Sequence, residues 1–139
     1  MGGTDIIAAL IGRPIQAMFG RPIELPPEFI ARYPELAKVQ WRRGGFPVNV
    51  AGWFLGHGSA AAITLWRTVF LSPAAIVDAE LLLHEFRHVQ QFEASPIFPV
   101  RYLLESARRG YFANRFEVDA REYAARRLGA ADAGRRGNT

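Results

Sequence analysis

The strongest chemical signal in this sequence lies within five consecutive residues. His84 and His88 stand four positions apart, and Glu85 follows the first histidine, which gives an H-E-x-x-H pattern. Residues four apart lie on one face of an α-helix, so both imidazoles can reach one ion. The pattern predicts a zinc ion (Zn²⁺) bound by His84 and His88. Zinc lowers the pKa of a bound water from about 15.7 to about 7, and Glu85 is the predicted base for that water.

A catalytic zinc normally has three protein ligands, so a third ligand must come from elsewhere in the chain. The candidates by residue type are His57, Glu93, Glu105, Glu117, Asp119 and Glu122. We predict Glu117, because Ala120 and Ala124 share its helical face and let that helix approach the histidine helix closely. Glu122 and Glu105 remain alternatives.

A hydrolytic site also needs a group that stabilises a developing oxyanion. The residues of suitable type are Tyr102, Tyr111, Tyr123 and His57. A structural role competes with this one for each of them, and His57 also fits a simple turn residue. Gln90 and Gln91, just after the second histidine, fit a structural role as well as a place in the cleft.

The elements that must position these residues can be read from the distribution of prolines and apolar residues. Residues 1–47 are rich in proline and predict short helices and turns, with helices over residues 5–18 and 27–42. Residues 48–55 and 60–71 predict a β-hairpin around the turn at residues 56–59. Ser72-Pro73 predicts the start of a helix over residues 73–94 that contains the H-E-x-x-H pattern.

Two further helices are expected after this one. A short helix over residues 100–109 ends at Gly110, and a helix over residues 113–128 carries Glu117. Residues 129–139 predict a disordered tail. The result is one α+β domain over residues 1–128, in which a small antiparallel sheet packs on the histidine helix.

Composition excludes several classes of site and partner. The chain has no cysteine, which excludes disulfides and thiolate zinc ligands. The net charge of +4 comes from arginine, since Lys38 is the sole lysine. Acidic residues interrupt the arginines of the last helices, so we expect no continuous positively charged stripe that could bind nucleic acid. The apolar run at residues 6–11 is too short to span a bilayer. No positively charged segment precedes it and no clear cleavage site of small residues follows, so we expect no signal peptide and a soluble protein, with the cytoplasm as the favoured compartment.

The order of strand, H-E-x-x-H helix and later Glu-x-x-Ala helix resembles the gluzincin metallopeptidases of the zincin class. It is most similar to their small, minigluzincin-type versions. The resemblance covers residues 60–128 and implies that residues 60–71 form an edge strand that pairs with an extended peptide substrate. Metzincins do not fit, because Gln91 and Ala94 occupy their glycine and third-histidine positions.

One position departs from the thermolysin-like members of that class. They carry an aspartate four residues after the ligand glutamate, and it supports the first histidine. This chain has Arg121 at that position. The support of the histidines must therefore differ, with Asp119, Asn114 or a backbone carbonyl as candidates. The resemblance implies a zinc peptidase acting on a peptide or protein substrate. A zinc-binding structural or interaction module without proteolysis is the alternative, and homo-oligomerisation stays open.

Overall fold

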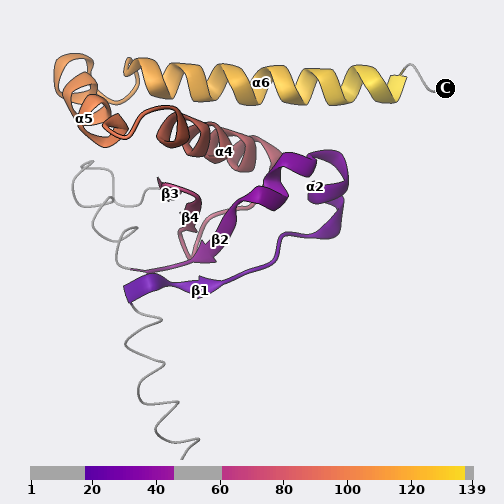
Figure 1. Cartoon of the computed structure of the whole chain (residues 1–139). Coiled ribbons are helices and arrows are strands. Elements are labelled where there is room, and N and C mark those ends of the chain that lie inside the picture. Colours follow the sequence, from indigo (N-terminus) through magenta and orange to yellow (C-terminus); the bar gives the residue numbers. More distant parts are fainter. Residues whose placement is uncertain (1–17, 46–60, 137–139) are drawn as a thin grey trace, which may run out of the picture.

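The computed structural model describes residues 18–45 and 61–136. Its strands form one sheet in the order β1-β2-β4-β3 (Figure 1). They are β1 (Arg21–Pro22), β2 (Gln40–Arg43), β3 (Ala62–Leu65) and β4 (Thr68–Leu71). β2 and β4 run parallel, whereas β1–β2 and β3–β4 are antiparallel. The α+β prediction is confirmed, but the sheet is mixed rather than antiparallel, and β3 lies at one edge of its described strands.

The single strand predicted over residues 60–71 is itself a hairpin, which corrects the sequence analysis. β3 and β4 are joined by a two-residue turn, Trp66-Arg67, in which Trp66 has a φ of 53°. No glycine, asparagine or proline marks this turn in the sequence. Contacts with the end of the histidine helix accompany it instead: the Trp66 ring packs at 5.6 Å from that of Phe92, and Arg67 pairs with Glu93 at 3.0 Å.

The N-terminal part consists of shorter elements than the sequence predicts. The helix expected over residues 27–42 is replaced by α2 (Pro27–Arg32), the 3₁₀-helix η1 (Pro34–Lys38) and then β2. Pro34 cannot continue the hydrogen bonding of α2, which explains the break. Residues 5–17 of the first expected helix and the predicted strand over residues 48–55 lie outside the described residues.

The histidine helix α4 (Ala79–Ala94) begins six residues later than predicted. Its N-cap is Asp78, whose carboxylate accepts a hydrogen bond of 2.8 Å from the backbone N–H of Leu81. Residues 72–75 form a turn instead, because the Arg43 guanidinium binds the carbonyl oxygens of Ser72, Pro73 and Ala75 at 3.2–3.3 Å. The turn is closed by the N–H of Ala75, which donates to the Ser72 carbonyl at 3.0 Å, and the carbonyls of Pro73 and Ala75 face an arginine from β2 rather than a helical N–H.

Two helices follow α4. Helix α5 (Phe98–Arg109) ends, as predicted, before Gly110, whose positive φ of 76° suits glycine. Helix α6 (Arg115–Arg136) is longer than expected, so the tail predicted from residue 129 continues the helix to Arg136. Contacts with α2 and η1 support this extension, since Arg32 pairs with Asp132 at 2.6 Å and Arg127 with Glu35 at 2.6 Å.

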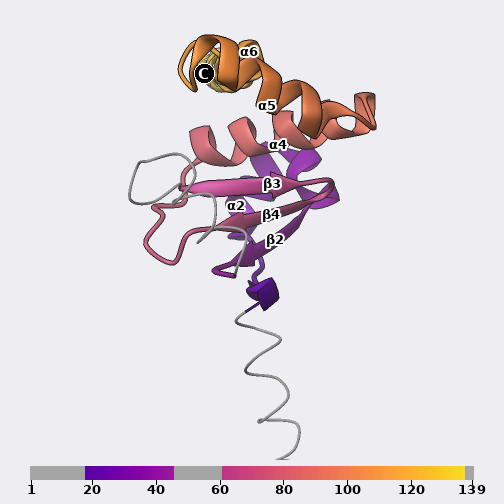
Figure 2. The ribbon, with the colours of Figure 1, turned by 90° about the vertical axis from the view of Figure 1, so that its left-hand side faces the viewer.

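Helix α4 is the middle layer of the structure. It lies between the sheet and α6 in both views (Figures 1 and 2). The core joins the sheet, η1, α4 and α6, and its fully buried members are Tyr33, Leu36, Val69, Leu71, Leu82, Leu83 and Ala124. Ala120 and Ala124 are both 0% exposed, so small residues set the approach of α6, as the sequence predicts. None of the helices in the described ranges combines the length and apolarity that a bilayer crossing needs.

Candidate metal centre

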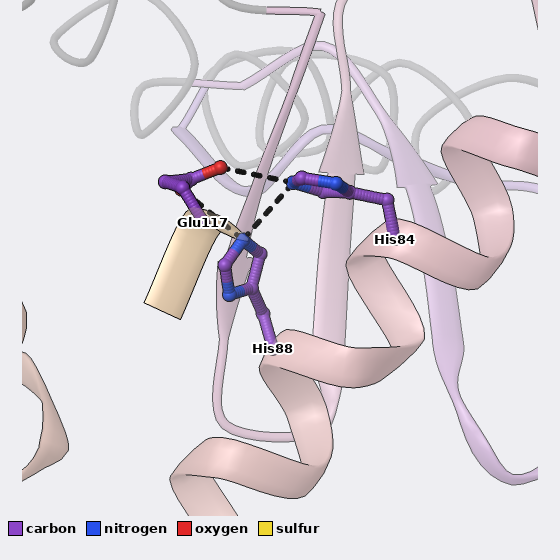
Figure 3. Close-up of side chains that lie close together, drawn as sticks. All are labelled: His84, His88 and Glu117. Atoms are coloured by element: carbon purple, nitrogen blue, oxygen red, sulfur yellow. Dashed lines mark hydrogen bonds and ion pairs between the residues drawn. The ribbon is translucent and has the colours of Figure 1, made fainter. Parts of the chain in front are cut away.

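Three side chains from two helices converge on one point. His84 and His88 lie one turn apart on α4, and Glu117 reaches them from the first turn of α6 (Figure 3). One potential ligand atom from each residue lies within 4.8 Å of the others. The centre is largely shielded from solvent, with exposed side-chain fractions of 16% for His84, 9% for His88 and 3% for Glu117. The structure therefore brings together the predicted third ligand and the two histidines.

The spacing of the three donors fits a small cation. The two Nε2 atoms are 3.2 Å apart, and they lie 3.1 Å and 3.2 Å from the Glu117 carboxylate oxygens. Two ligands of a tetrahedral zinc, each about 2.0–2.1 Å from the metal, are about 3.3 Å apart. Oε2 of Glu117 is buried and accepts no hydrogen bond of good geometry among the described residues, although His84 Nε2 is close. A shared cation would compensate this oxygen, which burial otherwise leaves without a partner.

The protonation of the centre follows from its burial and its charges. Burial acts to lower the pKa of His88, but Glu117, the charge of Glu85 and the Gln91 side chain outweigh it and raise the pKa to about 9. Burial acts to raise the pKa of Glu117, but the two histidines and Tyr102 hold that pKa far below its usual range. Without a metal, a proton on His88 therefore takes the place of a cation, and metal binding must displace it.

Gln91 holds Nδ1 of His88, the ring nitrogen that points away from the other two residues of the centre. His88 Nδ1 lies 2.7 Å from Gln91 Oε1, and Gln91 Nε2 donates to Asp119 Oδ2 at 2.8 Å and to the Phe116 carbonyl at 3.1 Å. Asp119 is held in turn by Arg87 at 2.7 Å. Because Gln91 Nε2 is the donor to the carboxylate, Oε1 faces His88 and accepts its Nδ1–H, which leaves Nε2 of His88 for a metal.

Asp119 and Asn114, the residues predicted to support the histidines, have other roles in the structure than the resemblance implies. Asp119 acts on a histidine, but through Gln91 and on His88, whereas the resemblance places support on the first histidine. Asn114 is fully buried and caps α6, since its Oδ1 accepts from the Phe116 N–H at 2.9 Å. Its amide donates to Ser106 and to the Tyr102 carbonyl, so Asn114 connects α5 to α6.

Tyr102 holds Glu117, the predicted third ligand. Its hydroxyl donates to Glu117 Oε1 at 2.7 Å, and burial, with the negative charge of Glu117, raises the pKa of Tyr102 far above its ordinary value. The Tyr102 ring stands edge-on to the His88 ring, with centroids 6.1 Å apart. This tyrosine, from α5, therefore orients the Glu117 carboxylate as the Gln91 amide orients His88.

Glu85 is held by the edge strand. Its side chain is buried, and Thr64 Oγ1 of β3 donates to Glu85 Oε2 at 2.7 Å. The negative charge of Glu85 helps to raise the pKa of His88, Tyr102 and Tyr111, so its carboxylate lies close enough to the centre to act on these groups.

The remaining predicted residues divide between the centre and the periphery. Burial and then the charges of Glu117 and Glu85 raise the pKa of Tyr111, so this partly exposed residue lies within reach of the charges of the centre. Tyr123 lies elsewhere, because it packs against Phe86, with ring centroids 6.1 Å apart, under the Arg87 guanidinium. The other carboxylates pair with arginines: Glu93 with Arg67, Glu105 with Arg109 and Arg115, and Glu122 with Arg126. His57 lies outside the described residues.

Sequence reasoning missed the roles of Thr64 and Gln91 for different reasons. Gln91 stands three positions after His88, a helical spacing that could have indicated the contact. Thr64 has no sequence signal, since its partner lies in another element. No protein-family model, curated protein or solved structure matches this chain.

Proposed function

We propose that this chain is a zinc-dependent metallopeptidase that hydrolyses peptide bonds at the centre formed by His84, His88 and Glu117. The convergence of three donors at tetrahedral spacing, two of them buried and His84 mostly so, carries the proposal. Two imidazoles and one carboxylate form a donor set that zinc accepts readily, and three protein ligands are typical of catalytic rather than structural zinc. A bound zinc would acidify water and polarise a substrate carbonyl.

In this proposal Glu85 is the general base and then the acid. Thr64 donates to its Oε2, so Oε1 would be the atom that transfers the proton. Glu85 would take a proton from the attacking water and pass it to the nitrogen of the departing amine. Burial of the carboxylate beside the centre keeps competing solvent protons away.

Tyr111 is the proposed oxyanion donor. It has a neutral hydroxyl up to high pH, because burial and the adjacent carboxylates raise its pKa. Tyr102 is the less suitable of the two tyrosines, since its side chain is less exposed than that of Tyr111 and its hydroxyl donates to Glu117 Oε1 at 2.7 Å. The substrate peptide would lie along β3, whose edge position in the described sheet supports pairing with an extended chain.

A zinc-binding module without proteolysis is the second candidate. The observation that favours it is the low exposure of the donors, of which His84 at 16% is the most accessible. In that case Glu85 and Thr64 would have structural roles only.

Metal analysis combined with one substitution separates the two candidates. We expect one zinc per chain in the purified protein, and loss of that zinc in His88→Ala. Glu85→Gln should keep the zinc and abolish cleavage of a denatured protein substrate, whereas the control Glu80→Gln, at an exposed position of α4, should retain both. Zinc without cleavage in the wild type would favour the module. Absence of zinc would refute both functions.

A further inference from the structure

Helix α5 presents an apolar face to solvent rather than to the protein. Val100, Leu103 and Leu104 stand at helical spacings of three and four, and their exposed fractions are 58%, 67% and 53%. Ile97, just before the helix, is 61% exposed, and Phe112, just after it, is 73% exposed. The inward side of the helix is different, because Phe98 and Glu105 are buried there. We call these five exposed residues the α5 face.

Arginine borders this face without a matching acidic residue. Residues 97–116 contain four arginines and a single glutamate, Glu105. That glutamate is buried and lies 3.0 Å from Arg109 and 4.0 Å from Arg115. Arg101 and Arg108 lie seven residues apart on one side of α5 and form no ion pair within the part of the chain that the structure describes. The border is therefore positively charged.

We propose that the α5 face binds the surface of an anionic lipid membrane. Apolar side chains flanked by arginine on one helix match the boundary between acyl chains and negatively charged headgroups. Large exposed apolar residues that are neighbours on a helix need a partner more than isolated ones do. A second copy of the chain fits less well, because pairing two α5 faces would bring Arg101 and Arg108 of both copies together.

This surface is separate from the metal centre but belongs to the same helix. Figure 1 shows α5 at one end of the helical layer, beyond α4 and α6. Its inward residue Tyr102 contacts Glu117, whereas Val100, Leu103 and Leu104 are turned to solvent. Membrane binding through the α5 face therefore requires neither zinc nor hydrolysis, and it would place the centre close to the lipid surface.

The test is co-sedimentation of the full chain with vesicles, either phosphatidylcholine alone or a mixture with phosphatidylserine, at low and physiological salt. We expect binding to the anionic vesicles, weakening with salt and unaffected by a metal chelator. Leu103→Ser should weaken binding about tenfold, while Ile76→Ser, at a residue 85% exposed outside this face, should leave it unchanged.

The charge contribution has its own matched pair of variants. Arg101→Gln with Arg108→Gln should weaken binding about fivefold for each arginine. Arg21→Gln with Arg126→Gln lowers the net charge equally, but away from α5, and should have a much smaller effect. Absence of binding to anionic vesicles, equal binding to neutral ones, or equal effects of the two arginine pairs would overturn the proposal. So would a dimer in vesicle-free solution that Leu103→Ser dissociates, since the face would then join two copies.

Discussion

Replacement of Gln91 by leucine tests whether the second histidine is held for metal binding. The side chain is 8% exposed, and leucine has a similar size, so the main loss is that of three polar contacts. His88 Nδ1 would lose its 2.7 Å partner inside the protein, and nothing would then favour the form that leaves Nε2 for zinc. Outer partners of this kind typically contribute a factor of about 10–100 to metal affinity. We therefore expect zinc to bind at least about tenfold more weakly to Gln91→Leu, which corresponds to about 1.4 kcal/mol.

The assay is competition for zinc with a chromophoric chelator, and the neighbouring residue supplies the control. Gln90 lies beside Gln91 but accepts a hydrogen bond from Arg87 instead of contacting His88. Gln90→Leu removes the same functional group from the same turn, and it should change zinc affinity less than about twofold. Thermal unfolding of both metal-free variants shows whether either has lost its fold.

Exchanging the amide of Gln91 and the carboxylate of Asp119 gives a sharper test of this prediction. Gln91→Glu alone would place a second carboxylate beside Asp119, which already lies 2.8 Å from the Gln91 amide, so zinc affinity should fall. Adding Asp119→Asn restores a donor opposite the new carboxylate and should recover much of the loss. The reasoning is refuted if Gln91→Leu binds zinc as tightly as Gln90→Leu, or if the double variant is no better than Gln91→Glu.

Four other predictions follow from the same centre. Zinc affinity should rise by about tenfold per pH unit between pH 7 and pH 9, because His88, with a pKa raised to about 9, must lose its proton before it binds; a flat profile would contradict the proton competition. In the metal-free protein, the contribution of protonated His88 to stability should be complete below about pH 6.5 and lost by about pH 9, which urea unfolding at several pH values measures. Thr64→Val, a replacement of similar shape, should lower the rate of hydrolysis but not zinc affinity, since Thr64 holds Glu85 rather than a ligand; an equal loss of zinc would assign Thr64 to the metal. Ala120→Leu should destabilise the protein by about 1–3 kcal/mol and weaken zinc binding, because the fully buried Ala120 sets the distance of Glu117 from α4; unchanged thermal unfolding would contradict that role.

The local patterns of the sequence indicated the two histidines of the centre and favoured Glu117 as their partner, with Glu122 and Glu105 left as alternatives. Helical spacing alone places His84 and His88 on one face, and the small residues Ala120 and Ala124 indicate which helix approaches them and hence favour Glu117. Such features depend on neighbours three or four positions apart in one helix, so they can be recognised without knowing the fold.

Only the tertiary structure decided how the elements begin, turn and support the centre. The start of α4 depends on Arg43 of β2, which binds the carbonyls of residues 72–75, and the turn at Trp66 is accompanied by packing against Phe92. Thr64 reaches Glu85 across 21 positions, and Asp119 reaches Gln91 across 28. Local propensity and periodicity carry no information about such pairs, because the contacts exist only after the sheet and the helices have packed.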